Sequence, residues 1–149
     1  MRHNANVYIR RDGAHAIITS VHENQDGVWC EDETPSPLQG PLDPTRLGEE
    51  TATAAPRARR INRDIREGKL TDWPVYRASG SASVRRFEED FICLNVTAAN
   101  DGNLIYEITG HVAKDHPLRV TASISRYAPA SELGALLLHV YRSCRDRVV

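Results

Sequence analysis

The sequence lacks an apolar stretch long enough to cross a membrane. Its longest runs without a charged residue, such as Phe91–Asn100, span about ten residues, whereas a membrane-spanning helix needs about 20. The first residues also contain no apolar run of signal-peptide length. We therefore expect a cytoplasmic protein with no membrane partner.

Cysteine is scarce as well, and Cys30, Cys93 and Cys144 are widely spaced and odd in number. In a reducing compartment such residues serve as small apolar side chains, so no disulfide framework is expected. Metal-ligand spacing is also missing. The nearest histidine pair, His111 and His116, is more widely spaced than the ligands of most zinc sites. The sequence predicts no metal and no other cofactor.

Neither sign of charge dominates, since 19 Lys and Arg stand against 20 Asp and Glu. Dedicated nucleic-acid-binding domains usually carry a basic excess, so this balance weighs against nucleic acid as the partner. The 149 residues are 40% hydrophobic and 26% charged. This length and composition are typical of one globular domain, expected to span residues 1–149.

Alternation of apolar and polar residues predicts strands in both halves of the chain. The clearest is Leu118–Ile124, whose strict period of two indicates a strand with one wet face. Related patterns, separated by turn signals such as Asn100–Asn103, predict further strands at Val7–Ile9, Ala14–Val21, Val28–Cys30, Phe91–Thr97 and Leu104–Thr109. The proline-rich segment Thr34–Pro41 is expected to be a loop, because proline removes a backbone donor.

Three segments predict helices. Asp43 and Pro44 form a typical helix start, because Asp caps free N–H groups and Pro fits the first helical position. That helix should end at Pro56, and a second is expected over Arg57–Glu67. The third, Leu133–Cys144, has an apolar stripe at 3.6-residue spacing. Together these patterns predict an α+β fold with an antiparallel sheet of about 5–6 strands and two to three helices packed on it.

The pairs Leu47-Gly48 and Leu133-Gly134 each place a glycine in the first turns of a predicted helix. Glycine inside a helix costs roughly 0.8–1.0 kcal/mol relative to alanine. A position that accepts this cost favours a close backbone approach. We therefore expect Gly134, together with Leu133, to be buried where the helix meets the sheet.

Two segments could bind phosphate or RNA. The first is the basic segment Arg57–Lys69, which is more often a solvated helix face. The second is Ser79–Arg86, where small residues precede two arginines, although the Gly-Lys-Ser/Thr ending of a phosphate-binding loop is missing. Ser83 there is equally a helix cap. An RNA- or nucleotide-binding module that uses Arg57–Lys69 is therefore the alternative function.

A small hydrolase-like enzyme is a third interpretation. It has less support, because no carboxylate has a nucleophile, a metal ligand set or a histidine at a recognisable spacing.

The segment Trp73–Glu88 contains Trp-Pro-x-Tyr, then Ser-Gly with Ser-Val three residues on, and then Phe-Glu, which is expected to open a strand. This pattern resembles the central motif of the immunity proteins of bacterial contact-dependent growth inhibition systems. The Leu-Gly helix starts and Cys144 are also similar to that family, and the resemblance extends from Asp43 to Val149. It implies a non-enzymatic cytoplasmic protein. Such a protein binds the cognate C-terminal toxin domain, often a nuclease, and blocks its active site or substrate path.

The acidic stretches are the candidate partner-binding residues, because a nuclease toxin needs a basic surface to hold phosphate. These residues are Glu31, Asp32, Glu33, Glu49, Glu50, Glu88, Glu89 and Asp90. The Trp73–Glu88 motif is expected to be structural, since Trp73, Tyr76 and Phe87 are large apolar anchors of the kind that cores use. No catalytic residue is assigned.

Overall fold

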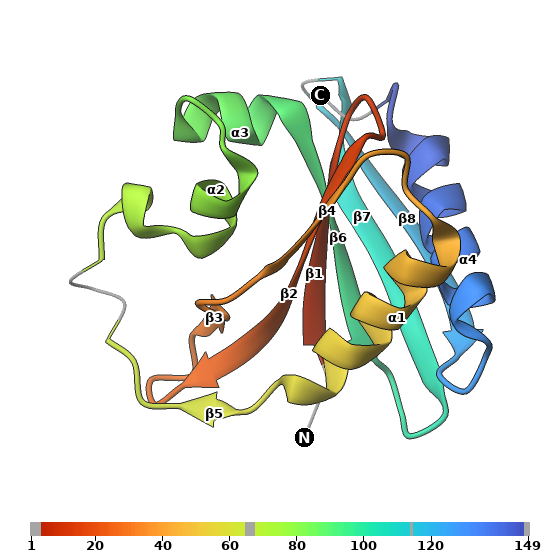
Figure 1. Ribbon diagram of the computed structural model, residues 1–149, viewed down its shortest axis with the longest axis horizontal. Coiled ribbons are helices and arrows are strands. Elements are labelled where there is room, and N and C mark those ends of the chain that lie inside the picture. Colours follow the sequence, from red (N-terminus) through yellow and green to blue (C-terminus); the bar gives the residue numbers. More distant parts are fainter. Residues whose placement is uncertain (1–3, 65–67, 114, 148–149) are drawn as a thin grey trace.

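A computed structural model describes residues 4–64, 68–113 and 115–147. The strands of its main sheet are β1 (Asn4–Arg10), β2 (His15–Asn24), β3 (Trp29–Glu31), β6 (Phe91–Ala98), β7 (Asn103–Ala113) and β8 (His116–Ser125). They lie in the order β3-β2-β1-β6-β7-β8, and neighbours are antiparallel (Figure 1). Two short strands, β4 (Ser36–Gln39) and β5 (Arg60–Ile61), pair with β2 beside this path.

Helices lie on both faces of the sheet. On one face are α1 (Pro44–Ala54) and α4 (Ala130–Cys144), and on the other are α2 (Pro74–Ser79) and α3 (Val84–Asp90) (Figure 1). Two single-turn 3₁₀ helices, η1 (Ala55–Arg57) and η2 (Leu70–Asp72), lie between α1 and α2 in the chain. The predicted α+β class with an antiparallel sheet is confirmed.

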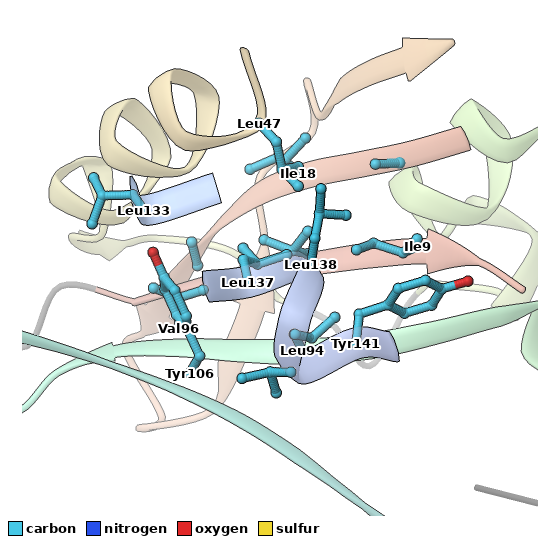
Figure 2. Packing of buried hydrophobic residues seen from close by; sticks show 14 of the residues in the cluster. Ile9, Ile18, Leu47, Leu94, Val96, Tyr106, Leu133, Leu137, Leu138 and Tyr141 are labelled. Carbon is cyan, nitrogen blue, oxygen red and sulfur yellow. The ribbon is translucent and has the colours of Figure 1, made fainter. Parts of the chain in front are cut away.

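The larger core lies between the sheet and the pair α1 and α4. Helix α4 contributes Leu137, Leu138 and Tyr141, which pack in one cluster with Leu94 and Tyr106 of the sheet (Figure 2). None of these five side chains is more than 3% exposed. Burying one side chain of this size contributes about 1.5–3 kcal/mol, so the apolar stripe of the last helix does face the sheet.

The smaller core lies on the opposite face. Tyr8, Ile17 and Phe91 of the sheet pack there against Val75 of α2 and Phe87 of α3. These two short helices cover only part of the face, where α2 contacts β2 and α3 contacts the start of β6. Further along the same face, the polar side chains of β6, β7 and β8 are exposed or half-buried; they are Asn95, Thr97, Glu107, Arg119, Thr121 and Ser123.

Local capping signals in the sequence determine where two helices begin. Asp43 Oδ2 accepts a hydrogen bond from the backbone N–H of Arg46 at 3.0 Å, and Pro44 is the first residue of α1. Ser83 Oγ accepts from the backbone N–H of Arg86 at 3.2 Å and caps α3. These hydrogen bonds satisfy donors that the first turn of a helix leaves free.

The helix predicted over Arg57–Glu67 is wrong. The chain forms η1 and then β5, whose residues Arg60 and Ile61 pair in parallel with the end of β2. Asn24 Nδ2 also donates to the carbonyl of Arg63 at 3.1 Å. The segment therefore satisfies its backbone against the sheet instead of within a helix. Residues 65–67 of the predicted helix lie outside the described part of the chain.

Two further expectations also need correction. The predicted loop Thr34–Pro41 contains β4, in which Pro37 is paired with Ile17 of β2. Proline is tolerated there because β4 is an edge strand, which among the described residues pairs with β2 alone. The Phe87-Glu88 pair lies within α3 and does not open a strand; β6 begins at Phe91.

Gly134 and Leu133 are buried, as predicted. The close approach at Gly134, however, is to α1 and not to the sheet. A Cβ atom added to Gly134 would lie 2.6 Å from the carbonyl carbon of Pro44. The glycine therefore permits a helix–helix contact.

Candidate functional site

A pocket of about 740 Å³ opens beside α2, on the incompletely covered face of the sheet. Strand β3 contributes Trp29 and Glu31 to its lining, η2 contributes Leu70, and Trp73 lies immediately before α2. Arg63 reaches it from the segment after β5. Residues from four parts of the chain therefore meet at this place.

Trp29 and Glu31 point to the same face because they are two residues apart in a strand. Glu31 is paired with Val21 of β2, and Trp29 with Glu23. The Trp29 residue is 49% exposed, and Leu70 on η2 is 75% exposed. Two large apolar side chains therefore border the pocket without being buried by the protein itself.

The Glu31 carboxylate accepts hydrogen bonds from three neutral donors. Oε1 accepts from the Tyr8 hydroxyl at 2.5 Å and from Asn6 Nδ2 at 2.9 Å. Oε2 accepts from the Trp73 indole Nε1–H at 2.6 Å. The indole and amide N–H groups only donate, so both Glu31 oxygens serve as acceptors. The side chain is thereby fixed in one orientation at the wall of the pocket.

Burial is the main influence on the pKa values of Tyr8 and Cys93, the two titratable groups beside Glu31. It raises the pKa of Tyr8, and the neighbouring Cys93 and Glu31 raise it further, so the hydroxyl keeps its proton. Burial, together with the charge of Glu31, raises the pKa of the Cys93 thiol to about 12. A thiol that stays protonated is a poor nucleophile, and Cys93 therefore has a packing role.

Arg63 links the pocket wall to β3. Its Nη1 donates to the backbone carbonyl of Glu31 at 2.8 Å, and its Nη2 forms an ion pair with the Glu33 carboxylate. Arg63 is half-buried, so these contacts hold the chain after β5 against β3. Its guanidinium is engaged with Glu33 and with the main chain of Glu31.

His22 fixes the other side of β3. Its ring is buried, with Nε2 located 3.0 Å from Asp32 Oδ2 and Nδ1 accepting from the backbone N–H of Arg59 at 3.3 Å. Burial tends to raise the pKa of Asp32, but hydrogen bonds from Thr34 and His22 outweigh it and lower the pKa to about 2. His22 therefore joins Asp32, at the end of β3, to Arg59 in the segment that leads into β5.

A second hollow, of about 310 Å³, continues from the pocket along the sheet. Asn6, Val21 and Trp29 line both cavities, and Thr97 and Glu107 extend the second one across β6 and β7. The pocket and the exposed polar face of the sheet thus form one connected concave surface.

The structure separates the eight predicted partner-binding acids into three groups. Glu31 and Glu33 line the pocket, while Asp32 between them is bound to His22. Glu49 and Glu50 lie on α1, across the sheet from the pocket. Glu88, Glu89 and Asp90 lie on α3, where Glu89 pairs with Arg85 at 2.9 Å and Asp90 with Arg86 at 3.9 Å. They do not form one continuous acidic patch, and their role in binding stays a prediction.

The sequence interpretation missed the residues that hold Glu31. The sequence patterns assign Tyr8 only to the strand Val7–Ile9, assign Trp73 only as a core anchor, and give Asn6 no role. Their separations from Glu31 along the chain are 25, 23 and 42 residues. A weak signal was available for Trp73, because a buried indole usually donates to a partner.

Several residues of the two candidate phosphate-binding segments are engaged within the protein, although residues 65–67 of the basic segment lie outside the described part of the chain. In the basic segment, Arg60 pairs with Glu23 at 3.7 Å, and Arg63 is bound as described above. In the other, Ser79 Oγ donates to the carbonyl of Tyr76 at 2.6 Å and accepts from the N–H of Ser81 at 3.0 Å. Gly80, with φ of 67°, ends α2 in the left-handed conformation that glycine allows. The serine segment is therefore a helix-ending turn.

Within residues 4–64, 68–113 and 115–147, no group of three or more His, Cys, Asp or Glu side chains is arranged to hold a metal ion. Across the same residues, no helix has the length and hydropathy needed to span a membrane.

Comparison with known proteins places the fold but not a sequence family. No family model and no curated protein matches the sequence. A solved protein of unknown function from Neisseria meningitidis is similar in structure, with a TM-score of 0.74 and 18% identity over 97% of this chain and 96% of that one. A chain of the CdiA-CT/CdiI toxin and immunity complex from Yersinia pseudotuberculosis is also similar, with a TM-score of 0.65 and 12% identity over 96% and 97%. At these identities the similarity shows a shared fold.

Proposed function

We propose that this chain is an immunity protein of a contact-dependent growth inhibition system. It acts in the cytoplasm, where it binds the cognate C-terminal toxin domain, a nuclease, and blocks the active site or substrate path. The observation that carries the proposal is the similarity, over 96% of the chain, to a chain of a toxin and immunity complex. The resemblance of the Trp73–Glu88 motif to that family supports it from the sequence.

The position of this motif in the fold supports a binding role. Trp73 and Phe87 pack edge to face with ring centroids 4.9 Å apart, and Tyr76 packs on Phe87 at 6.3 Å. The same Trp73 donates to Glu31 in the pocket wall. The motif therefore builds and rigidifies the pocket, which agrees with a passive inhibitor that presents a preformed surface.

The exposed side chains at the pocket suit a protein partner. Trp29 and Leu70 present apolar area beside a polar, concave sheet face. Protein interfaces are enriched in exposed aromatic anchors surrounded by polar groups. A non-enzymatic role is consistent with the chemistry at the pocket wall, where Glu31 is held by three hydrogen bonds. The Cys93 thiol near Glu31 has a raised pKa and stays protonated.

The test is protection of cells from the toxin. The C-terminal domain encoded immediately upstream of this chain would be expressed from an inducible promoter, with and without the chain, and colony counts compared. We expect survival only with the chain, and a 1:1 complex of the two purified proteins by light scattering. Absence of both protection and complex formation would refute the proposal.

The RNA-binding alternative is tested with the same purified protein. An RNA-binding module should retain nucleic acid at low salt and lose it steeply as salt rises. We expect no bound nucleic acid, because Arg60 and Arg63 are already paired with acids of the protein. Salt-dependent retention of RNA together with failure to protect would favour the alternative.

A further inference from the structure

Within the described part of the chain, the Glu31 carboxylate is oriented by hydrogen bonds but forms no ion pair with a cationic side chain. Its three side-chain donors, Asn6, Tyr8 and Trp73, are all uncharged. The nearest described arginine contact, from Arg63, is to the Glu31 main chain, while the Arg63 guanidinium pairs with Glu33. A charge held in this way is available to an incoming cation, and its orientation costs nothing further on binding.

The surroundings of Glu31 suit an organic cation more than a metal ion. Trp29, two residues away on the same face of β3, is half-exposed and lines the same pocket as Glu31. An aromatic face and a carboxylate together favour guanidinium or ammonium groups, and arginine in particular stacks on aromatic rings while it pairs with acids. Leu70, which also lines the pocket, can contact the aliphatic part of such a side chain.

We propose that this pocket receives an arginine side chain of the protein partner, with the guanidinium between the Glu31 carboxylate and the Trp29 ring. This inference rests on the proposed function, since it assigns to the toxin domain a basic side chain that enters the pocket. It also selects Glu31 from the eight acids as the one that contacts the partner within a built cavity. The pocket volume of about 740 Å³ leaves room for the side chain and part of its main chain.

The protein carries its own reporters for this binding. It contains two tryptophans, Trp29 and Trp73, and both line the pocket. A ¹⁵N NMR spectrum therefore has two indole signals, one from the exposed ring and one from the N–H that donates to Glu31. The probe is N-acetyl-arginine amide, and the matched control is N-acetyl-citrulline amide, which has the same shape without the charge. N-acetyl-aspartate amide tests the opposite charge.

We expect both indole signals to shift with the arginine amide and to saturate at a dissociation constant of about 1–10 mM, as suits a single side chain. The citrulline and aspartate amides should produce no saturable shift. Glu31→Gln should weaken binding at least ~10-fold, whereas Glu49→Gln on α1, across the sheet from the pocket, should leave it unchanged. Trp29→Ala should weaken it about 2- to 5-fold through loss of the stacking contact. This variant keeps all three Glu31 donors, so it also serves if Glu31→Gln fails to fold.

Three results would overturn the inference. They are no indole shift with the arginine amide at 100-fold excess, an equal shift with the citrulline amide, or wild-type affinity for the arginine amide in both Glu31→Gln and Trp29→Ala. The toxin domain then separates the inference from the function. Glu31→Gln should lower toxin affinity about 30-fold or more, while Glu49→Gln on α1 should not. If the toxin binds Glu31→Gln and Glu49→Gln with the affinity of the wild type, the immunity role stands and the arginine pocket is wrong. If the arginine amide binds but the upstream domain neither binds nor kills, the proposed function is wrong.

Discussion

Gly48 and Gly134 lie at the point where α1 and α4 cross, and each faces the backbone of the other helix. A Cβ atom on Gly48 would lie 2.7 Å from the carbonyl carbon of Ala130 and 3.0 Å from the nitrogen of Gly134. A Cβ atom on Gly134 would lie 2.6 Å from the carbonyl carbon of Pro44. The neighbours are backbone atoms and cannot rotate away. The two Leu-Gly pairs of the sequence are thus the two halves of one helix crossing.

This contact predicts that Gly→Ala substitutions destabilise the protein, which is the opposite of their usual effect in a helix. Gly→Ala within a helix normally stabilises by about 1 kcal/mol. Gly134→Ala and Gly48→Ala should instead each destabilise by roughly 1–3 kcal/mol, because the helices must separate to accept a methyl group. Urea unfolding followed by circular dichroism would measure this. As the control, Ala135→Ser on the exposed side of α4 should change stability by less than about 0.6 kcal/mol. Stabilisation by either glycine variant would contradict the crossing.

The donors to Glu31 should contribute to stability individually. Tyr8→Phe and Trp73→Phe each keep an aromatic ring in the smaller core but remove one hydrogen bond to the carboxylate. Each should cost about 1–3 kcal/mol, since a half-buried charge loses a partner. Tyr76→Phe is the matched control, because its ring packs on Phe87 and its hydroxyl forms no hydrogen bond with a described residue. Equal melting temperatures for all three variants would show that the network contributes nothing.

Low pH should destabilise the fold, because it protonates Asp32. The folded-state pKa of about 2 lies below the ordinary value of 3.8, so ionised Asp32 stabilises the fold above about pH 4. That contribution, up to roughly 2 kcal/mol, is lost as the pH falls from about 4 to about 2. Asp32→Asn should therefore be less stable than wild type at pH 7, and the difference should shrink across this interval. Asp101→Asn, in an exposed turn, should track the wild type throughout.

The three cysteines should differ in reactivity. With a pKa of about 12, Cys93 is about 1 part in 10⁴ thiolate at pH 8. Burial also raises the pKa of Cys144, which is fully buried. Iodoacetamide at pH 8 should therefore modify Cys30 first, as mass spectrometry of tryptic peptides would show. Modification of all three at one rate in the folded protein, as expected in denaturant, would be the opposite result.

The three acidic groups should contribute unequally to toxin binding. Replacing Glu31 should mainly accelerate dissociation, whereas replacing exposed Glu33 should slow association and reduce its salt dependence. Paired substitutions at Glu49 and Glu50, or at Glu88 and Glu89, should change affinity by less than about 0.5 kcal/mol. Surface plasmon resonance at two salt concentrations would separate these effects. A dominant effect from α1 or α3 would place the interface away from the pocket.

Much of the fold follows from local patterns in the sequence. The alternation over Leu118–Ile124 predicts a strand that the structure extends to β8, and the stripe over Leu133–Cys144 predicts α4. Helix α1 begins at the Asp43-Pro44 signal. These predictions succeed because periodicity and capping depend on residues within a few positions of one another.

The basic segment shows where local patterns are insufficient. The spacing of Ile61 and Ile65 is compatible with a helix, yet Arg60 and Ile61 join the sheet through β5. The strand is preferred because Asn24 and the end of β2 offer backbone and side-chain partners that no window of the sequence contains. Helix propensity is a weak preference that tertiary contacts override.

The sequence by itself determined the α+β class, the helix caps, the apolar faces of strands and helices, and the presence of eight acidic candidates. Only the tertiary structure decided which acid lies in a pocket. Glu31 is distinguished by Asn6, Tyr8 and Trp73, which are 23 to 42 residues away along the chain and meet it only when β1, β3 and the start of α2 assemble. The physical reason is range, since capping and periodicity act between neighbours in sequence, whereas hydrogen bonding and burial in a cavity depend on neighbours in space.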